Sequence, residues 1–308
     1  MIDTEGLTKK FGELTAVDRL TIHVDEGEIF GLLGPNGAGK TTTVRMLCSL
    51  ISKTGGSARV AGYDVGNQAD SLKIRGLIGF VPDNVGLYEA LTAYDNLDFY
   101  GKLHSTPEAR RKENIERFLK MLGLWEKKDD DVSTFSKGMK QKLALARALI
   151  HDPKVLFLDE PTANLDPEAA KTVRDFILEL KGEGRTIFLN THNLDEAQRI
   201  CDRIGILNTS LRALGTPEEL ERTVKGRATV VQLEQVTEPI LDALHGLSLG
   251  EVSVERNKVT ISLADPEKQN ATVMDAIFRA GGRVRSVNVV GSTLEEAYLK
   301  LVREKEEK

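Results

Sequence analysis

The chain has 308 residues, of which 40% are hydrophobic and 29% are charged, and it carries a formal net charge of −5. This composition is typical of a soluble globular protein with room for about two domains, and it argues against a nucleic-acid-binding surface. No apolar run approaches the roughly 20 residues that cross a bilayer, and the N-terminus lacks a signal-peptide pattern. Cys48 and Cys201, the only cysteines, lie in apolar segments, which predicts a reducing compartment without disulfides.

The first part of the chain leads into one glycine-rich loop. We predict a β-type segment at residues 20–24, a buried strand at 28–33 and a helix at 42–50. The loop between strand and helix reads Gly34-Pro35-Asn36-Gly37-Ala38-Gly39-Lys40-Thr41, which is the phosphate-loop pattern in its required context. Its glycines let backbone N–H groups face phosphate oxygens, Lys40 would reach the β- and γ-phosphates, and the Thr41 hydroxyl would hold Mg²⁺. The loop therefore predicts a nucleotide site.

Three later apolar strands also end in polar residues. They are predicted at residues 77–81, 155–158 and 186–189, and are followed by Asp83, by Asp159-Glu160 and by His192, respectively. Two adjacent carboxylates directly after a buried strand are hard to explain by packing, because burying them unpaired is costly. In an open parallel sheet, ligands bind beyond the carboxyl ends of the strands. We therefore expect these side chains and the phosphate loop to surround one nucleotide at one edge of a sheet.

Beyond Gly226 the pattern changes and predicts a second, smaller α+β domain. Strands are expected at 228–233, 251–254, 259–263 and 283–290, and helices at 238–244 and 271–280, an order that resembles a βαββαβ ferredoxin-like unit. Alternation of apolar and polar residues at 258–263 predicts a sheet with one face in water. We find no metal-ligand spacing and no nucleophile with a base in this region, so we expect an accessory domain at 224–308.

Five motifs of the chain, in this order, resemble those of the ATP-binding cassette family, over residues 2–222. They are the phosphate loop (Walker A), Phe135-Ser136-Lys137-Gly138-Met139 (the signature), residues 155–160 (Walker B and the catalytic glutamate), Ala163-Asn164-Leu165-Asp166 (the D-loop) and the switch histidine, His192. The run Ser-Lys-Gly-Met-Lys-Gln is similar to that of ABC-2 type exporters of drugs, sodium and polysaccharides. The resemblance implies an α/β fold for residues 1–223: a P-loop NTPase cassette with a RecA-like core, an antiparallel β-subdomain and a helical subdomain at about 85–150.

The resemblance also implies roles for individual residues. Lys40, Glu160 and His192 would be catalytic, with Glu160 polarising the attacking water and His192 contacting the γ-phosphate. The residues implied to bind ATP are Phe11, which would stack on adenine, Gly34, Pro35, Asn36, Gly37, Ala38, Gly39, Lys40, Thr41, Thr42, Ser136, Gly138 and Asp166. Those implied to hold Mg²⁺ are Thr41, Asp83 and Asp159. Two of the ATP-binding residues have an alternative explanation: Phe11 as an ordinary core or surface residue, and Asp166 as a helix cap.

The sequence departs from the family pattern at two places. Lys137 and Met139 stand where the commonest signature has glycine and glutamine, so that only Ser136 and Gly138 carry over. Asp83 stands where the family usually has the glutamine of the Q-loop. A carboxylate still offers an oxygen to Mg²⁺, but its charge near the γ-phosphate would weaken ATP binding or alter the coupling to a partner.

The chain has one phosphate loop and one signature, so the resemblance implies a homo- or heterodimer of cassettes that sandwiches ATP. It also implies a permease on a separate chain, gripped near residues 86–92, although Leu87 and Tyr88 are equally explained as core. The implied function is that of the ATP-hydrolysing subunit of an ABC-2 type exporter, cytoplasmic and peripheral on the inner face of the membrane, using ATP and Mg²⁺, with no nucleic-acid partner. Alternatives are a soluble cassette ATPase acting on ribosomes or DNA, and a nucleotide sensor that scarcely hydrolyses ATP.

Overall fold

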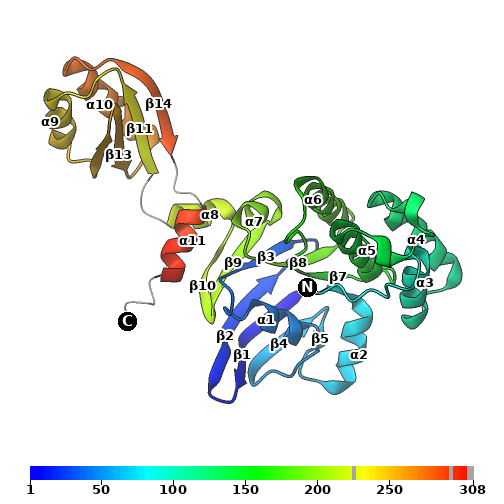
Figure 1. Ribbon diagram of the computed structural model, residues 1–308. Coiled ribbons are helices and arrows are strands. Elements are labelled where there is room, and N and C mark those ends of the chain that lie inside the picture. Colours follow the sequence, from blue (N-terminus) through cyan, green and yellow to red (C-terminus); the bar gives the residue numbers. More distant parts are fainter. Residues whose placement is uncertain (224–226, 291–293, 304–308) are drawn as a thin grey trace. The chain divides into compact units, whose positions relative to one another are not determined.

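In a computed structural model, which describes residues 1–223, 227–290 and 294–303, the strand before the phosphate loop lies inside a six-stranded sheet (Figure 1). The sheet order is β10-β9-β3-β8-β7-β6, and only β10 pairs antiparallel with its neighbour. The strands are β3 (Ile29–Leu33), β6 (Ile78–Val81), β7 (Val155–Asp159), β8 (Thr186–Thr191), β9 (Arg203–Asn208) and β10 (Ser210–Gly215). Every residue of β3, β7 and β8 is buried, as expected for parallel strands covered on both faces.

A second, antiparallel sheet packs on the first. Its order is β2-β1-β4-β5, formed by β1 (Ile2–Phe11), β2 (Leu14–Val24), β4 (Gly55–Val60) and β5 (Tyr63–Asp64). One cluster of buried side chains joins both sheets and the helix after the phosphate loop, for example Ile22, Val44, Val60, Phe157 and Phe188. This shared core fixes the hairpin of β1 and β2 against the phosphate loop.

Helices cover the six-stranded sheet and form a separate helical part. They are α1 (Lys40–Leu47), α2 (Gln68–Leu77), α3 (Ala93–Leu103), α4 (Glu108–Met121), α5 (Lys137–Leu149), α6 (Pro167–Gly182) and α7 (Leu194–Ile200), with short 3-10 turns at Trp125–Lys127 and Val132–Thr134. α3, α4 and α5 pack on one another and make up the helical subdomain. The predicted cassette fold, with a parallel core sheet, an antiparallel sheet and a helical subdomain, is confirmed.

Local details differ from the sequence prediction. α1 begins at Lys40 rather than at residue 42, because Gly39 (φ 99°) turns the chain directly into the helix. A Cβ at this glycine would lie 2.3 Å from the Ala16 carbonyl oxygen, so the position requires glycine. α2, β9 and β10 were not predicted. α2 buries only Ile74, so it has no apolar stripe that would reveal it, and its start depends on the Asn67 side chain, which accepts the N–H of Ala69.

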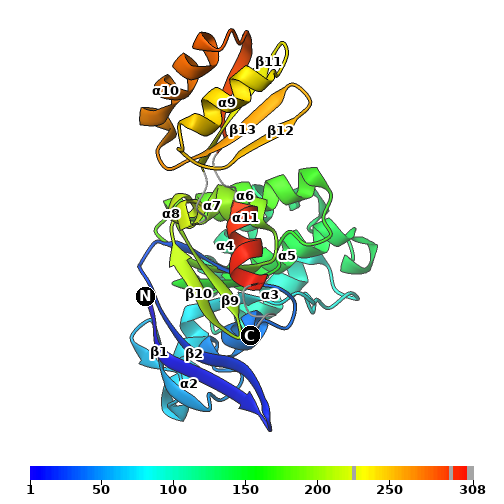
Figure 2. The same ribbon diagram turned by 90° about the vertical axis from the view of Figure 1, so that its left-hand side faces the viewer.

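The chain divides into two compact units, Met1–Pro217 and Glu218–Lys308. The boundary predicted from the sequence lies between residues 223 and 224, six residues later, at the end of α8 (Pro217–Thr223). Residues 224–226 lie outside the described residues. The second unit contains β11 (Arg227–Leu233), α9 (Glu238–Gly246), β12 (Val252–Glu255), β13 (Lys258–Leu263), α10 (Pro266–Arg279), β14 (Val284–Val290) and α11 (Leu294–Arg303). Its sheet order β12-β13-β11-β14 is antiparallel throughout, which is the predicted ferredoxin-like arrangement. α9 and α10 pack together beside this sheet (Figure 2).

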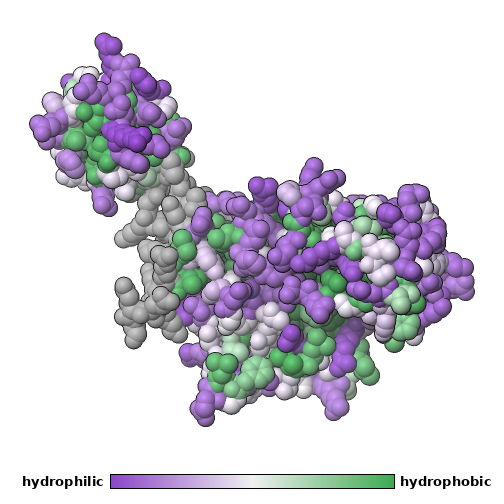
Figure 3. Space-filling model, in the orientation of Figure 1, coloured by the Kyte–Doolittle hydropathy of each residue, from purple (hydrophilic) through white to green (hydrophobic). Residues whose placement is uncertain are grey.

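Hydrophilic side chains predominate on the face of the molecule seen in Figure 3, and hydrophobic ones gather in small groups. Among the helices of the described ranges, none has the length and the apolar character needed to span a bilayer.

Candidate nucleotide-binding and catalytic site

The phosphate loop, residues 34–39, joins the end of β3 to the start of α1 at the carboxyl edge of the parallel sheet. Gly34 lies so close to the neighbouring β9 that a Cβ would come within 2.2 Å of the Leu207 carbonyl oxygen. Gly37 has a φ of 81°, in the left-handed region that favours glycine. These glycines allow the loop to wrap round the N-terminus of α1, where unpaired backbone N–H groups and the helix dipole favour an anion.

Lys40 is buried under this loop, with 6% of its surface exposed. Its Nζ donates hydrogen bonds to the carbonyl oxygens of Gly34 at 2.7 Å and Pro35 at 3.1 Å. Burial lowers the pKa of the ammonium group, and the negative charges of Glu160 and Asp159 act in the opposite direction. The cation is therefore held where the loop would cradle phosphates.

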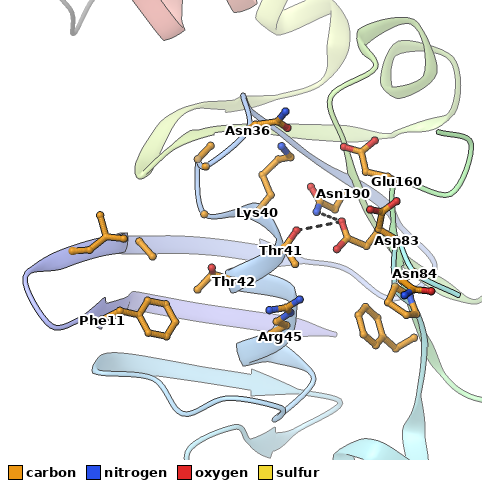
Figure 4. A pocket seen from close by; sticks show the side chains of 18 residues that line it. Phe11, Asn36, Lys40, Thr41, Thr42, Arg45, Asp83, Asn84, Glu160 and Asn190 are labelled. Atoms are coloured by element: carbon orange, nitrogen blue, oxygen red, sulfur yellow. Dashed lines mark hydrogen bonds between the residues drawn. The ribbon is translucent and has the colours of Figure 1, made fainter. Parts of the chain in front are cut away.

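The pocket beside the loop has a volume of about 630 Å³ and gathers most of the predicted residues. Figure 4 shows Phe11 at one end, Asp83 and Glu160 at the other, and Lys40 and Thr41 between them. The lining residues are Phe11, Leu14, Ala16, Asn36, Gly37, Ala38, Gly39, Lys40, Thr41, Thr42, Arg45, Phe80, Pro82, Asp83, Asn84, Asp159, Glu160 and Asn190. Sequence reasoning gave no role to Leu14, Ala16, Arg45, Asn84 and Asn190.

Phe11 lies at the tip of the β1–β2 hairpin, and half of its surface is exposed. Lys9 Nζ lies 4.8 Å from the centre of its ring and donates a hydrogen bond to the Ser52 carbonyl oxygen at 2.6 Å. The ring is therefore supported from one side and exposed to the pocket, which suits stacking on a nucleobase.

Carboxylates converge at the opposite end of the pocket. Asp159 Oδ1 lies 3.5 Å from Thr41 Oγ1 and accepts a hydrogen bond from the Asn190 side-chain amide. Burial raises the pKa of Asp159, and the neighbouring charges of Glu160 and Asp83 raise it further. A divalent cation would relieve this repulsion.

The donor set fits Mg²⁺ that arrives with a nucleotide. Among the residues described, no group of three or more His, Cys, Asp or Glu side chains is arranged to hold a metal. Mg²⁺ is usually bound by one or two carboxylates together with substrate phosphates and water, and Thr41, Asp159 and Asp83 offer such a partial set.

Glu160 follows β7 with a φ of 51°, an uncommon conformation for a residue other than glycine and one that occurs at functional sites. Its backbone N–H donates to the Asn190 carbonyl oxygen at 2.8 Å, which fixes the turn. Both carboxylate oxygens have partners: Oε1 lies 2.7 Å from His192 Nδ1, and Oε2 lies 3.3 Å from Thr191 Oγ1. His192 does not line the pocket and instead reaches the site through Glu160.

Besides Gly34, Pro35 and His192, three more predicted residues do not line this pocket: Ser136, Gly138 and Asp166. Ser136 and Asp166 are the N-caps of α5 and α6: Ser136 Oγ accepts from the Met139 N–H at 3.3 Å, and Asp166 Oδ1 from the Ala169 N–H at 2.8 Å. A Cβ at Gly138 would lie 3.1 Å from the Cβ of Ala169, so the first turns of the two helices are in contact. The signature and the D-loop are thus adjacent to each other and separate from the Walker A lysine of the same chain.

Comparison with known proteins gives consistent matches. The sequence pattern of the family described as ABC transporter matches residues 17–163. The linearmycin resistance ATP-binding protein LnrL of Bacillus subtilis (strain 168) is 34% identical over 307 residues, which cover 98% of each chain. The daunorubicin/doxorubicin resistance ATP-binding protein DrrA of Streptomyces peucetius is 34% identical over 305 residues, which cover 97% of this chain and 92% of that one.

A solved structure matches about two thirds of the chain. It is a dimeric post-hydrolysis state of the ATP-binding cassette MJ0796 bound to ADP and Pi, with a TM-score of 0.64 and 26% sequence identity, covering 70% of this chain and 98% of that one. Sequence, fold and pocket therefore agree: the chain belongs to the ABC transporter family and is an ATP-binding ATPase of that family.

Proposed function

We propose that this ATPase is the nucleotide-binding subunit of an ABC-2 type exporter, that it works as a dimer, and that it acts on the cytoplasmic face of the membrane through a permease on another chain. The similarity to LnrL and DrrA, both named as resistance ATP-binding proteins, supports this proposal because it extends over nearly the whole chain, the second unit included. A toxic small molecule is the class of cargo that these names suggest.

The main observation in favour of a dimer is that the two halves of the ATP site, the Walker A pocket and the signature, are separate within one chain. Ser136 and Gly138 lie at the start of α5, a helix of 13 residues whose N-terminus suits an anion, yet neither lines the pocket that contains Lys40. A second cassette would bring its own α5 to the γ-phosphate held by the first. ATP would then close the dimer, and hydrolysis would open it.

Within each cassette of the dimer, different residues would have different roles in ATP hydrolysis. The N–H groups of the phosphate loop and the Lys40 ammonium would hold and orient the β- and γ-phosphates. Glu160 would accept a proton from the attacking water, and His192, bound to Glu160, would position that water against the γ-phosphate. Mg²⁺, held by Thr41, Asp159 and Asp83, would neutralise the charge that develops on the phosphates.

An exposed aromatic cluster on the helical subdomain supports the permease contact. Tyr88 and Phe99 are 49% and 42% exposed, and their ring centres are 5.2 Å apart. Arg147 of α5 holds the segment before Tyr88, donating hydrogen bonds to the Val85 and Gly86 carbonyl oxygens at 2.5 and 2.9 Å. A force on the aromatic cluster would therefore reach the helix that carries the signature.

Replacing Tyr88 with glutamate tests the proposed function. We expect the wild-type chain to sediment with membranes, to purify with an integral-membrane protein and to hydrolyse ATP several-fold faster with that protein in liposomes. Tyr88→Glu should lose both the association and the stimulation, because it puts a charge into an apolar contact, while its ATPase activity alone is unchanged. The matched control is Leu72→Glu, at a 74% exposed position on α2. A chain that ignores membranes and binds RNA or DNA at physiological salt would favour the soluble alternative.

Asp83 provides a separate prediction about the metal site. Its charge lies close enough to raise the pKa of Asp159, so we propose that it attracts the same cation. Asp83→Asn should raise the Mg²⁺ concentration needed for half-maximal ATPase activity about fivefold, which corresponds to about 1 kcal/mol for the loss of one exposed charge. Binding of Mn²⁺ in the presence of ATP, followed by electron paramagnetic resonance, should weaken in parallel. Unchanged values in both measurements would remove Asp83 from the metal site.

A further inference from the structure

A second carboxyl group lies behind Glu160, and the mechanism above does not use it. Glu196, in the first turn of α7, is only 2% exposed. Its Oε2 accepts a hydrogen bond from Thr162 Oγ1 at 2.7 Å, and Thr191 Oγ1 lies 3.3 Å away. Its Oε1 is buried without a hydrogen-bond partner among the described residues. Burying an ionised carboxylate with one oxygen that accepts no hydrogen bond costs much free energy, whereas burying the unpaired carbonyl oxygen of a neutral carboxylic acid costs much less.

The hydroxyl of Thr191 lies between the two carboxyl groups. Its Oγ1 is 3.3 Å from Glu196 Oε2 and 3.3 Å from Glu160 Oε2, and it accepts the backbone N–H of Asn193 at 3.0 Å. A hydroxyl has one proton and two lone pairs. It therefore cannot donate to both carboxylates, but it can donate to one while accepting from the other if the other carries a proton.

The charges around Glu196 favour the protonated form. Burial is the largest cause of its raised pKa, and the nearby charge of Glu160 acts in the same direction. The hydrogen bonds from Thr162 and Thr191 and the charge of Arg174 act in the opposite direction without cancelling the effect. Cys201, which also lies near Glu196, is itself kept neutral because burial raises its pKa.

We propose that Glu196 works as a neutral carboxylic acid whose O–H donates to Thr191 Oγ1, so that the only proton of Thr191 is given to Glu160. Glu196 is then a positioning residue for ATP hydrolysis. Thr191 holds Glu160 at Oε2 and His192 holds it at Oε1, and each carboxylate oxygen keeps a lone pair for water. If Glu196 were ionised, it would compete for the Thr191 proton and add a like charge beside the general base.

Two substitutions at Glu196 separate this role from simple packing. Glu196→Ala should lower kcat about ten- to a hundredfold, the usual effect of removing a group that orients another, with little change in KM. Glu196→Gln keeps the shape, cannot ionise, and can donate N–H groups to Thr191 and Thr162, so it should restore most of that loss. In the wild type, kcat should decline as the pH rises through the pKa of Glu196, and Glu196→Gln should remove this decline.

Infrared spectroscopy provides a readout that does not depend on turnover. The wild-type spectrum should contain the carbonyl stretch of a protonated carboxylic acid that is missing from the Glu196→Gln spectrum. If the difference between the wild-type and Glu196→Gln spectra lacks this band, or if Glu196→Gln hydrolyses ATP as slowly as Glu196→Ala, the proposal is wrong. Thermal unfolding and ATP binding are measured for each variant to check that it folds. If Glu196→Ala does not fold, it is replaced by Thr191→Val, with Thr191→Ser as the control. The inference depends on Glu160 acting as the base, and an unimpaired Glu160→Gln would refute that assignment separately.

Discussion

Replacing Glu160 with glutamine is expected to slow ATP hydrolysis by about 10²- to 10⁴-fold, the usual contribution of a positioned general base. The amide keeps the shape of the side chain and can still bond to His192, but it cannot accept a proton from the attacking water. ATP binding should persist or tighten, because one negative charge next to Asp159 and the γ-phosphate is lost. Phosphate release and the affinity for a fluorescent ATP analogue, measured on the same preparation, check both expectations.

The matched control is Glu116→Gln on α4, since this glutamate is exposed and its carboxylate accepts a hydrogen bond from Lys120 of its own helix. It should change neither quantity. We also expect Glu160→Gln to accumulate as an ATP-bound dimer in size-exclusion chromatography, because a dimer that closes on ATP reopens only after hydrolysis. A variant that hydrolyses ATP at the wild-type rate would exclude Glu160 as the base.

The edge of the sheet that holds the site could be predicted from the sequence because its strands are short, apolar and buried on both faces. Residues 29–33 and 155–158 are buried apolar runs, and the glycine loop after the first and the carboxylate pair Asp159-Glu160 after the second mark where the strands end. The parallel order then brings those ends together. β9 (203–208) has a similar contrast, because its four central residues are buried and it ends at Asn208, so it could have been recognised. β10 (210–215) has no such contrast, because it is mostly half-buried at the edge of the sheet. Its sequence resembles that of an ordinary loop.

The polar network behind Glu160 could not be predicted, for a different reason. Thr162, Thr191 and Glu196 are up to 34 residues apart in the chain, and each is common in surface loops and in the first turns of helices. Only the packing of α7 against β3 and β8 makes them buried partners. Periodicity reports burial of apolar side chains, whereas hydrogen bonds between distant hydroxyl and carboxyl groups leave no periodic signal.

Lys40→Met is expected to weaken ATP binding about a hundredfold. Methionine fills the space of the buried lysine stem, but it supplies no charge to the phosphates and leaves the Gly34 and Pro35 carbonyl oxygens without their donor. A hundredfold loss corresponds to about 2.7 kcal/mol, and hydrogen bonds to charged groups contribute about 1.5–3 kcal/mol each, so the loss of one such contact with the phosphates accounts for an effect of this size. Titration calorimetry with a non-hydrolysable analogue and Mg²⁺ measures the affinity directly.

Ligand-induced stabilisation checks the same prediction without turnover. At an ATP-analogue concentration of 100 times the wild-type Kd, the wild type should gain about 2.7 kcal/mol of unfolding free energy, and Lys40→Met only about 0.4 kcal/mol. Lys112→Met, on the exposed face of α4, serves as the control and should behave like the wild type. If Lys40→Met were stabilised as much as the wild type, the phosphates would bind elsewhere. Because the loop, the carboxylate pair and His192 were all interpreted around those phosphates, their roles would then have to be reassigned together.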